Sequence, residues 1–166
     1  TEQDVGRSSE LAYWQGVASQ AAGDAAAAHT RWIEATGTKV GISRRGSHDQ
    51  LSGQQIQLYY QALARRELGN TAEAEASLAT VSAAAHDDAR LSFSIALALA
   101  QAKQYGKAET FFSRALELDP ANFDILYNLG LAASHAGHQQ RAYEVLQTAL
   151  QVRPDDVDVL YNLGAI

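Results

Sequence analysis

The chain has 166 residues, of which 46% are apolar, and its formal net charge is -6. This apolar content is enough for a continuous core and excludes a disordered chain, and the length predicts a single domain over residues 1–166. The acidic balance argues against nucleic-acid binding, which depends on clustered Lys and Arg, and no apolar run approaches the roughly 20 residues that a membrane-spanning helix needs.

The residue types predict an all-α protein. Alanine is abundant and there are only two prolines, and alanine has the most favourable helix propensity whereas proline interrupts helices. The absence of cysteine excludes a disulfide framework and a thiolate metal site, and it leaves the compartment open. The chain begins at Thr1 without a Met and stops at Ile166 inside an expected helix, so we expect it to be an excised part of a longer protein.

An internal repeat sets the architecture. The sequence LYNLG at Leu126–Gly130 recurs as Leu160–Gly164, one period of 34 residues later. Stepping by this period divides the chain, in order, into four copies and a partial fifth: 9–42, 55–88, 89–122, 123–156 and 157–166. The first two copies are separated by twelve extra polar residues, 43–54, which we expect to form a surface loop.

Three registers of the period carry a common residue type. One register holds a small residue (Gly16, Ala62, Ala96, Gly130), one holds alanine (Ala28, Ala74, Ala108, Ala142), and two copies close on proline (Pro120, Pro154). The pattern resembles the tetratricopeptide repeat family over nearly the whole chain. That resemblance implies an α-solenoid of antiparallel helix pairs, wound into a right-handed superhelix whose first helices line a concave groove.

Each copy is expected to be a helical hairpin. In the copy 123–156, apolar residues recur at helical spacing on both sides of Gly137, and glycine tolerates the positive φ that ends a helix. Gly130 and Ala142 are expected to be small because the two helices cross closely there. A single hairpin of this length would be marginal in water, so the copies must stack to share a core.

The best site candidates form an aromatic register on the first helices: Tyr13, Tyr59, Phe93, Tyr127 and Tyr161. Aromatic side chains are enriched among interface hot spots, so these residues would line the groove that the resemblance implies. The competing interpretation is that an aromatic at this register braces adjacent hairpins. Three leucines and one arginine at neighbouring positions complete the predicted groove: Leu63, Arg66, Leu97 and Leu131.

Two asparagines, Asn128 and Asn162, follow the aromatic directly and are added to the predicted groove. In groove-binding members of the family such amides hydrogen-bond an extended peptide backbone. Tyr60 and Ser94 occupy the same register in earlier copies, so a long amide ladder is not supported. Three acidic residues (Glu10, Asp124, Asp158) and two arginines (Arg66, Arg90) are expected on the groove side. They predict a mixed surface that becomes acidic towards the C-terminal end, which would suit a basic or polar segment.

No catalytic constellation is found, and we expect neither enzyme activity nor a cofactor. The five histidines lack metal-site spacing, and there is no phosphate loop or nucleophile elbow. His135 and His138 are three residues apart but have no third ligand nearby in sequence, so no metal site is predicted.

The sequence therefore predicts a non-catalytic scaffold that binds a protein or peptide partner on its concave face. Two alternatives stay open. Leu160 and Leu163 would lack a hairpin partner, which favours self-assembly through an exposed C-terminal helix. The chain could also be the substrate-presenting arm of a larger enzyme, because fold alone does not assign function.

Overall fold

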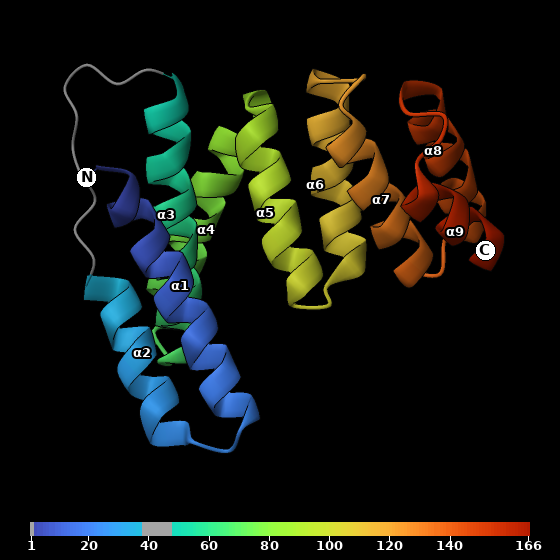
Figure 1. Cartoon of the computed structure of the whole chain (residues 1–166). Helices are drawn as coiled ribbons and strands as arrows, with labels where there is room; N and C mark the ends of the chain where they lie inside the picture. The colour runs from blue at the N-terminus through green and yellow to red at the C-terminus, as the bar shows by residue number, and fades with distance from the viewer. Residues whose placement is uncertain (1, 38–47) are drawn as a thin grey trace. The chain divides into compact units, whose positions relative to one another are not determined.

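The computed structural model describes the backbone of residues 2–37 and 48–166, and the side chains of residues 9–37 and 53–166. Within these residues the chain is helical and contains no strand, which confirms the predicted all-α class (Figure 1). The helices are α1 (Glu2–Ala21), α2 (Ala25–Gly37), α3 (His48–Glu67), α4 (Thr71–Ala84), the short 3-10 helix η1 (Ala85–Asp87), α5 (Ala89–Gln101), α6 (Tyr105–Leu118), α7 (Phe123–His135), α8 (Gln139–Val152) and α9 (Val157–Ala165).

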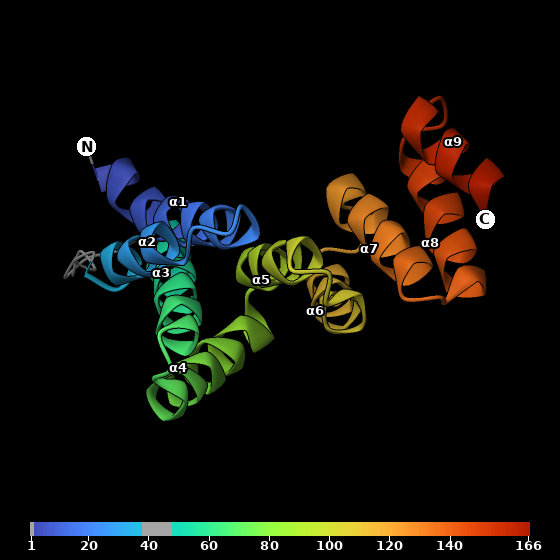
Figure 2. The ribbon, with the colours of Figure 1, turned by 90° about the horizontal axis from the view of Figure 1, so that it is seen from below.

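The chain forms two compact units, Thr1–Ala84 and Ala85–Ile166, which we describe separately. In the first unit α1 packs against α2, α3 against α4, and α3 also contacts both α1 and α2. In the second unit each helix from α5 to α9 packs against the next one along the chain. Figure 2 shows the run α7, α8, α9 from below, with α8 beside both of its neighbours. Both units are therefore built from helical hairpins.

The helix bounds correct one prediction. His48–Gln54, expected to belong to a surface loop, lies in the first two turns of α3. A polar segment without apolar periodicity gives no helix signal by itself, yet it can extend a helix whose later turns are buried. The other residues of that predicted loop, 43–47, lie outside the described residues.

Tight turns join the two helices of each hairpin. Gly23, Gly69 and Gly137 all adopt φ between 85° and 87°, the left-handed conformation that ends a helix, as predicted for Gly137. In the third hairpin Lys103 takes this position with φ 58°. Its backbone makes the same bonds as a glycine turn, because Gln104 N–H donates to Leu99 O as His138 N–H donates to Ala133 O. A non-glycine residue can thus end α5, at some cost in strain.

The first helices of the second unit are capped by side chains from the residue that precedes them. Asp88 accepts a hydrogen bond from Leu91 N–H, Asn122 accepts from Ile125 N–H, and Asp156 accepts from Val159 N–H. Such caps satisfy donors that have no partner inside the helix and favour its start at that residue. Each repeat boundary is therefore fixed locally.

Small residues let the paired helices cross closely. A Cβ atom added at Gly130 would lie 2.6 Å from Leu146 on α8, and one added at Gly16 would collide with the Trp32 ring on α2. Both clashes involve fully packed side chains, so the glycines are required by packing, as predicted for Gly130. One cluster of the core in the second unit contains Leu126, Leu146 and Val159 from α7, α8 and α9.

Candidate functional site

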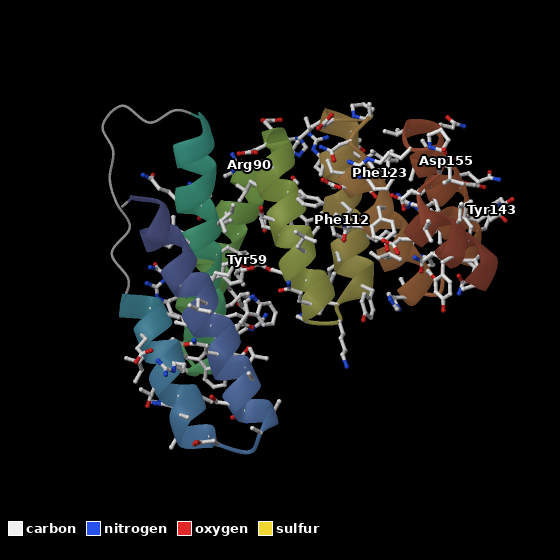
Figure 3. All side chains as sticks on the ribbon, viewed as in Figure 1. Tyr59, Arg90, Phe112, Phe123, Tyr143 and Asp155 are labelled. Atoms are coloured by element: carbon white, nitrogen blue, oxygen red, sulfur yellow. The ribbon has the colours of Figure 1, made fainter. Side chains whose placement is uncertain are left out.

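The aromatic register has two different environments. In the first unit Tyr13 and Tyr59 are only 4% and 5% exposed, and Leu63 is also buried. Figure 3 labels Tyr59 on α3. Their burial leaves little of these three side chains open to a partner in a groove. It favours the competing interpretation, in which an aromatic at this register braces adjacent hairpins.

Four aromatic rings of the first unit, those of Tyr13, Trp14, Tyr59 and Tyr60, form one cluster. Tyr60 lies 5.7 Å from Tyr59, 5.9 Å from Tyr13 and 6.4 Å from Trp14, measured between ring centroids. The Tyr60 hydroxyl donates a hydrogen bond of 3.0 Å to Glu10, so this carboxylate, which we expected on the groove side, is engaged with the aromatic cluster. Burial raises the pKa of Tyr13, Tyr59 and Tyr60 above its ordinary value. These hydroxyls therefore stay neutral and structural.

In the second unit the same register is more open. Phe93 on α5 and Tyr127 on α7 are half-buried, and Tyr161 on α9 is 76% exposed. Phe93 contacts the buried Phe112 of α6, labelled in Figure 3, at 5.7 Å between ring centroids. Tyr127 stacks on Phe123 at 6.1 Å. Phe93 and Tyr127 thus each contact a buried ring and keep part of their surface open, whereas Tyr161 is mostly open.

The leucines predicted beside these rings are half-buried as well. Leu97 lies one turn after Phe93 on α5, and Leu131 lies one turn after Tyr127 on α7. We call the surface formed by Phe93, Leu97, Tyr127, Leu131 and Tyr161 the first-helix face. Arg66, in the first unit, is partly exposed and pairs with Glu67 at 3.5 Å, so it does not belong to this face. The role of the first-helix face in binding stays a prediction.

Both predicted asparagines have their amide groups oriented by their own helix. The Nδ2 of Asn128 donates to Asp124 O at 2.7 Å, and that of Asn162 donates to Asp158 O at 2.7 Å. Asn162 Nδ2 also lies 3.4 Å from the Tyr127 hydroxyl, which links α9 to α7. Asn162 uses both N–H groups of its amide and Asn128 uses one of its two, so the side-chain oxygens and one N–H of Asn128 are available to an incoming group.

A buried ion-pair cluster was not anticipated from the sequence. Glu109 on α6 is 5% exposed, and its carboxylate lies 2.7 Å from His138 Nδ1 and 3.1 Å from Arg141 Nε. Arg141 also donates to Ser113 Oγ at 2.7 Å. His138 and Arg141 are 29 and 32 residues after Glu109 in the sequence. A local pattern does not connect residues so far apart. The 34-residue period could have indicated the pairing, because it places the second helices of successive hairpins in contact. The cluster fastens α8 to α6 and borders an open depression.

The histidines are engaged in separate contacts. His138 pairs with Glu109, whereas the His135 ring stacks on Tyr105 at 4.7 Å. Among the described residues no group of three or more His, Asp or Glu side chains is placed to hold a metal ion. In the same part of the chain, none of the helices has the length and apolar character that crossing a bilayer would require.

Two models of the tetratricopeptide repeat match the sequence, one over residues 59–123 and the other over residues 99–165. The chain belongs to the tetratricopeptide repeat family. The matched residues include hairpins with glycine turns and small residues at the helix crossings. Proteins of this family typically act as interaction scaffolds without catalysis. No curated protein sequence matches the chain.

Solved structures of tetratricopeptide repeat proteins share the fold. A crystal structure of MamA superposes with a TM-score of 0.53 at 17% identity, covering 90% of this chain and 81% of that one. MamA 41-end from Desulfovibrio magneticus RS-1 gives 0.51 at 20% identity, covering 95% and 82%. YrrB, described as a tetratricopeptide repeat protein with an unusual peptide-binding site, gives 0.51 at 19% identity, covering 93% and 73%.

Proposed function

We propose that this protein is a non-catalytic scaffold that binds an extended segment of a partner protein along the first-helix face of its second unit. The observation that carries the proposal is the difference within the aromatic register: Tyr13 and Tyr59 are buried, whereas Tyr161 is 76% exposed and Phe93 and Tyr127 are half-buried. Exposed aromatic rings beside leucines supply apolar contact area with little loss of conformational entropy.

The polar groups of this face suit a peptide backbone. Asn128 and Asn162 each keep a side-chain oxygen as acceptor, and a peptide in extended conformation presents N–H donors at regular intervals. Asp124 and Asp158 are exposed on the same helices, so a segment with basic residues is favoured. The peptide-binding site named for YrrB supports a binding role for this fold without locating the site in this chain.

The test is a selection of displayed random 12-residue peptides on the whole chain, followed by binding measurements with variants. Tyr127→Ala combined with Leu131→Ala should weaken selected peptides at least about tenfold, because two apolar contacts are lost. Ile33→Ala is the matched control, since Ile33 is an exposed apolar residue on α2, away from the face. Helical content and the urea midpoint show whether each variant is folded. Peptides that bind the folded double variant as tightly as the original chain would refute the proposal.

A further inference from the structure

Two aromatic rings are stacked at the start of α7. Phe123 and Tyr127, one helical turn apart, have ring planes within 5° of parallel and centroids 6.1 Å apart. Phe123, labelled in Figure 3, is 8% exposed. The guanidinium carbon of Arg153 lies 3.9 Å from the centroid of the Phe123 ring. The stack therefore already holds one guanidinium group through a cation–π contact.

Tyr127 is the more open ring of this stack. It is half-buried, and among the described residues no cation lies over its ring. Its hydroxyl lies 3.4 Å from Asn162 Nδ2 on α9, and α7 also contacts α5. Tyr127 thus has a neighbouring first helix on each side, so its open surface does not depend on either end of the chain.

A carboxylate lies on the same turn of α7. Asp124 is exposed and precedes Tyr127 by three residues, which places both on one side of the helix. The backbone carbonyl of Asp124 accepts a hydrogen bond from Asn128 Nδ2. In the described part of the chain, neither the Asp124 carboxylate nor the Asn128 side-chain oxygen has a donor of its own. This turn therefore presents oxygen acceptors beside an aromatic ring.

The side chain that matches this arrangement is arginine. A guanidinium group is planar, carries five N–H donors and stacks on aromatic rings. A carboxylate accepts two of these N–H groups in parallel, and an amide oxygen accepts another. A lysine ammonium could pair with the carboxylate, but it has no planar surface to place on the ring.

The neighbouring first helix differs in charge at this register. Arg90, labelled on α5 in Figure 3, stands one period of 34 residues before Asp124. A basic side chain of a bound segment would be repelled at Arg90 and attracted at Asp124. The charges therefore direct that side chain to α7.

We propose, as a refinement that rests on the proposed function, that an arginine of the partner segment anchors it to α7. We call the three residues Asp124, Tyr127 and Asn128 the arginine niche. Asp124 pairs with the guanidinium group, Tyr127 stacks on it, and the side-chain oxygen of Asn128 accepts one further N–H. The niche gives the first-helix face a preference for one residue type.

Asp124 has a second role that the test must separate. It lies in the first turn of α7, where a carboxylate stabilises the helix by interacting with the unpaired N–H groups. That interaction is present with or without a ligand. Only the niche makes the effect of removing the carboxylate depend on an arginine in the bound peptide.

The probes are the displayed 12-residue peptides selected on the whole chain. The peptide that binds tightest is synthesised with each arginine in turn replaced by lysine or by citrulline, which keeps the shape of arginine and lacks its charge. Fluorescence anisotropy measures binding to the original chain and to Asp124→Asn. Glu144→Gln is the matched control, because it removes the same charge from an exposed position on α8.

We expect Asp124→Asn to weaken one arginine-containing peptide about fivefold and its citrulline copy by less than about twofold. Glu144→Gln should change neither by more than about twofold. In Tyr127→Leu, which keeps apolar bulk, the preference for arginine over lysine should be lost, because leucine makes no cation–π contact. Helical content and the urea midpoint show whether each variant is folded.

The outcomes separate the niche from the proposed function. Selected peptides without arginine, or equal weakening of the arginine and citrulline peptides by Asp124→Asn, would overturn the niche. The proposed function would still stand if Tyr127→Ala with Leu131→Ala weakened those same peptides. If no peptide is selected, or if the double variant binds as tightly as the original chain, both proposals fail together.

Discussion

Helices α7 and α9 contain the same five residues, Leu-Tyr-Asn-Leu-Gly, in two different environments. In α7, Leu126 is 1% exposed and the side chain of Leu146 fills the space beside Gly130. In α9, the equivalent Leu160 is 49% exposed and the space beside Gly164 is open. Local conformation is the same, since both helices begin after a capping Asn or Asp. The difference teaches that the repeat sequence sets the helix and its contact surface, whereas a neighbouring helix decides whether that surface is core.

The largest effect expected from this comparison is on stability. Leu126→Ala should lower the free energy of unfolding by about 3 kcal/mol, because it leaves a cavity in a packed core. Leu160→Ala, the matched change in α9, should lower it by less than about 1 kcal/mol, since its side chain is already half in water. Urea unfolding followed by circular dichroism measures both. Equal losses would show that α9 is as well covered as α7.

The next comparison is between the buried Glu109 and the exposed Glu144. Glu109→Gln should destabilise the chain by about 1 kcal/mol, because a buried carboxylate loses its charge-assisted bonds to His138 and Arg141 while both of those side chains stay solvated. Glu144→Gln, at an exposed position on α8, is the control and should change stability by less than about 0.5 kcal/mol. Thermal unfolding of both variants measures the difference. Equal midpoints would show that the Glu109 cluster contributes no stability.

The smallest effect is expected at the turn after α5. Lys103→Gly should raise the free energy of unfolding by about 0.5 to 1 kcal/mol, because glycine adopts positive φ without the clash of a Cβ atom. The substitution would give this turn a glycine at the position of positive φ, as in the turn at Gly137. Lys107→Gly, an exposed helical position in α6, is the contrasting change and should be destabilising. A loss of stability in Lys103→Gly, measured in urea, would contradict the account of this turn.

The two units differ in a way that the repeat pattern did not indicate. One register holds Tyr13 and Tyr59 in the first unit and Tyr127 and Tyr161 in the second, yet the first pair is buried and the second is not. The cluster around Tyr60 and Trp14 accounts for the burial in the first unit. Periodicity assigns a residue to a helix face, but the bulk of neighbours from other helices decides how much of that face is left open.

The sequence alone determined the all-α class, the 34-residue hairpin repeat, the glycine turns and the small residues at the helix crossings. These features depend on backbone preference and on contacts between residues close in the chain, which repeat with the period. The start of α3 at His48, the Glu109 cluster and the exposure of each aromatic ring were decided by tertiary structure. They depend on which side chains meet across separate helices, and no local pattern encodes that meeting.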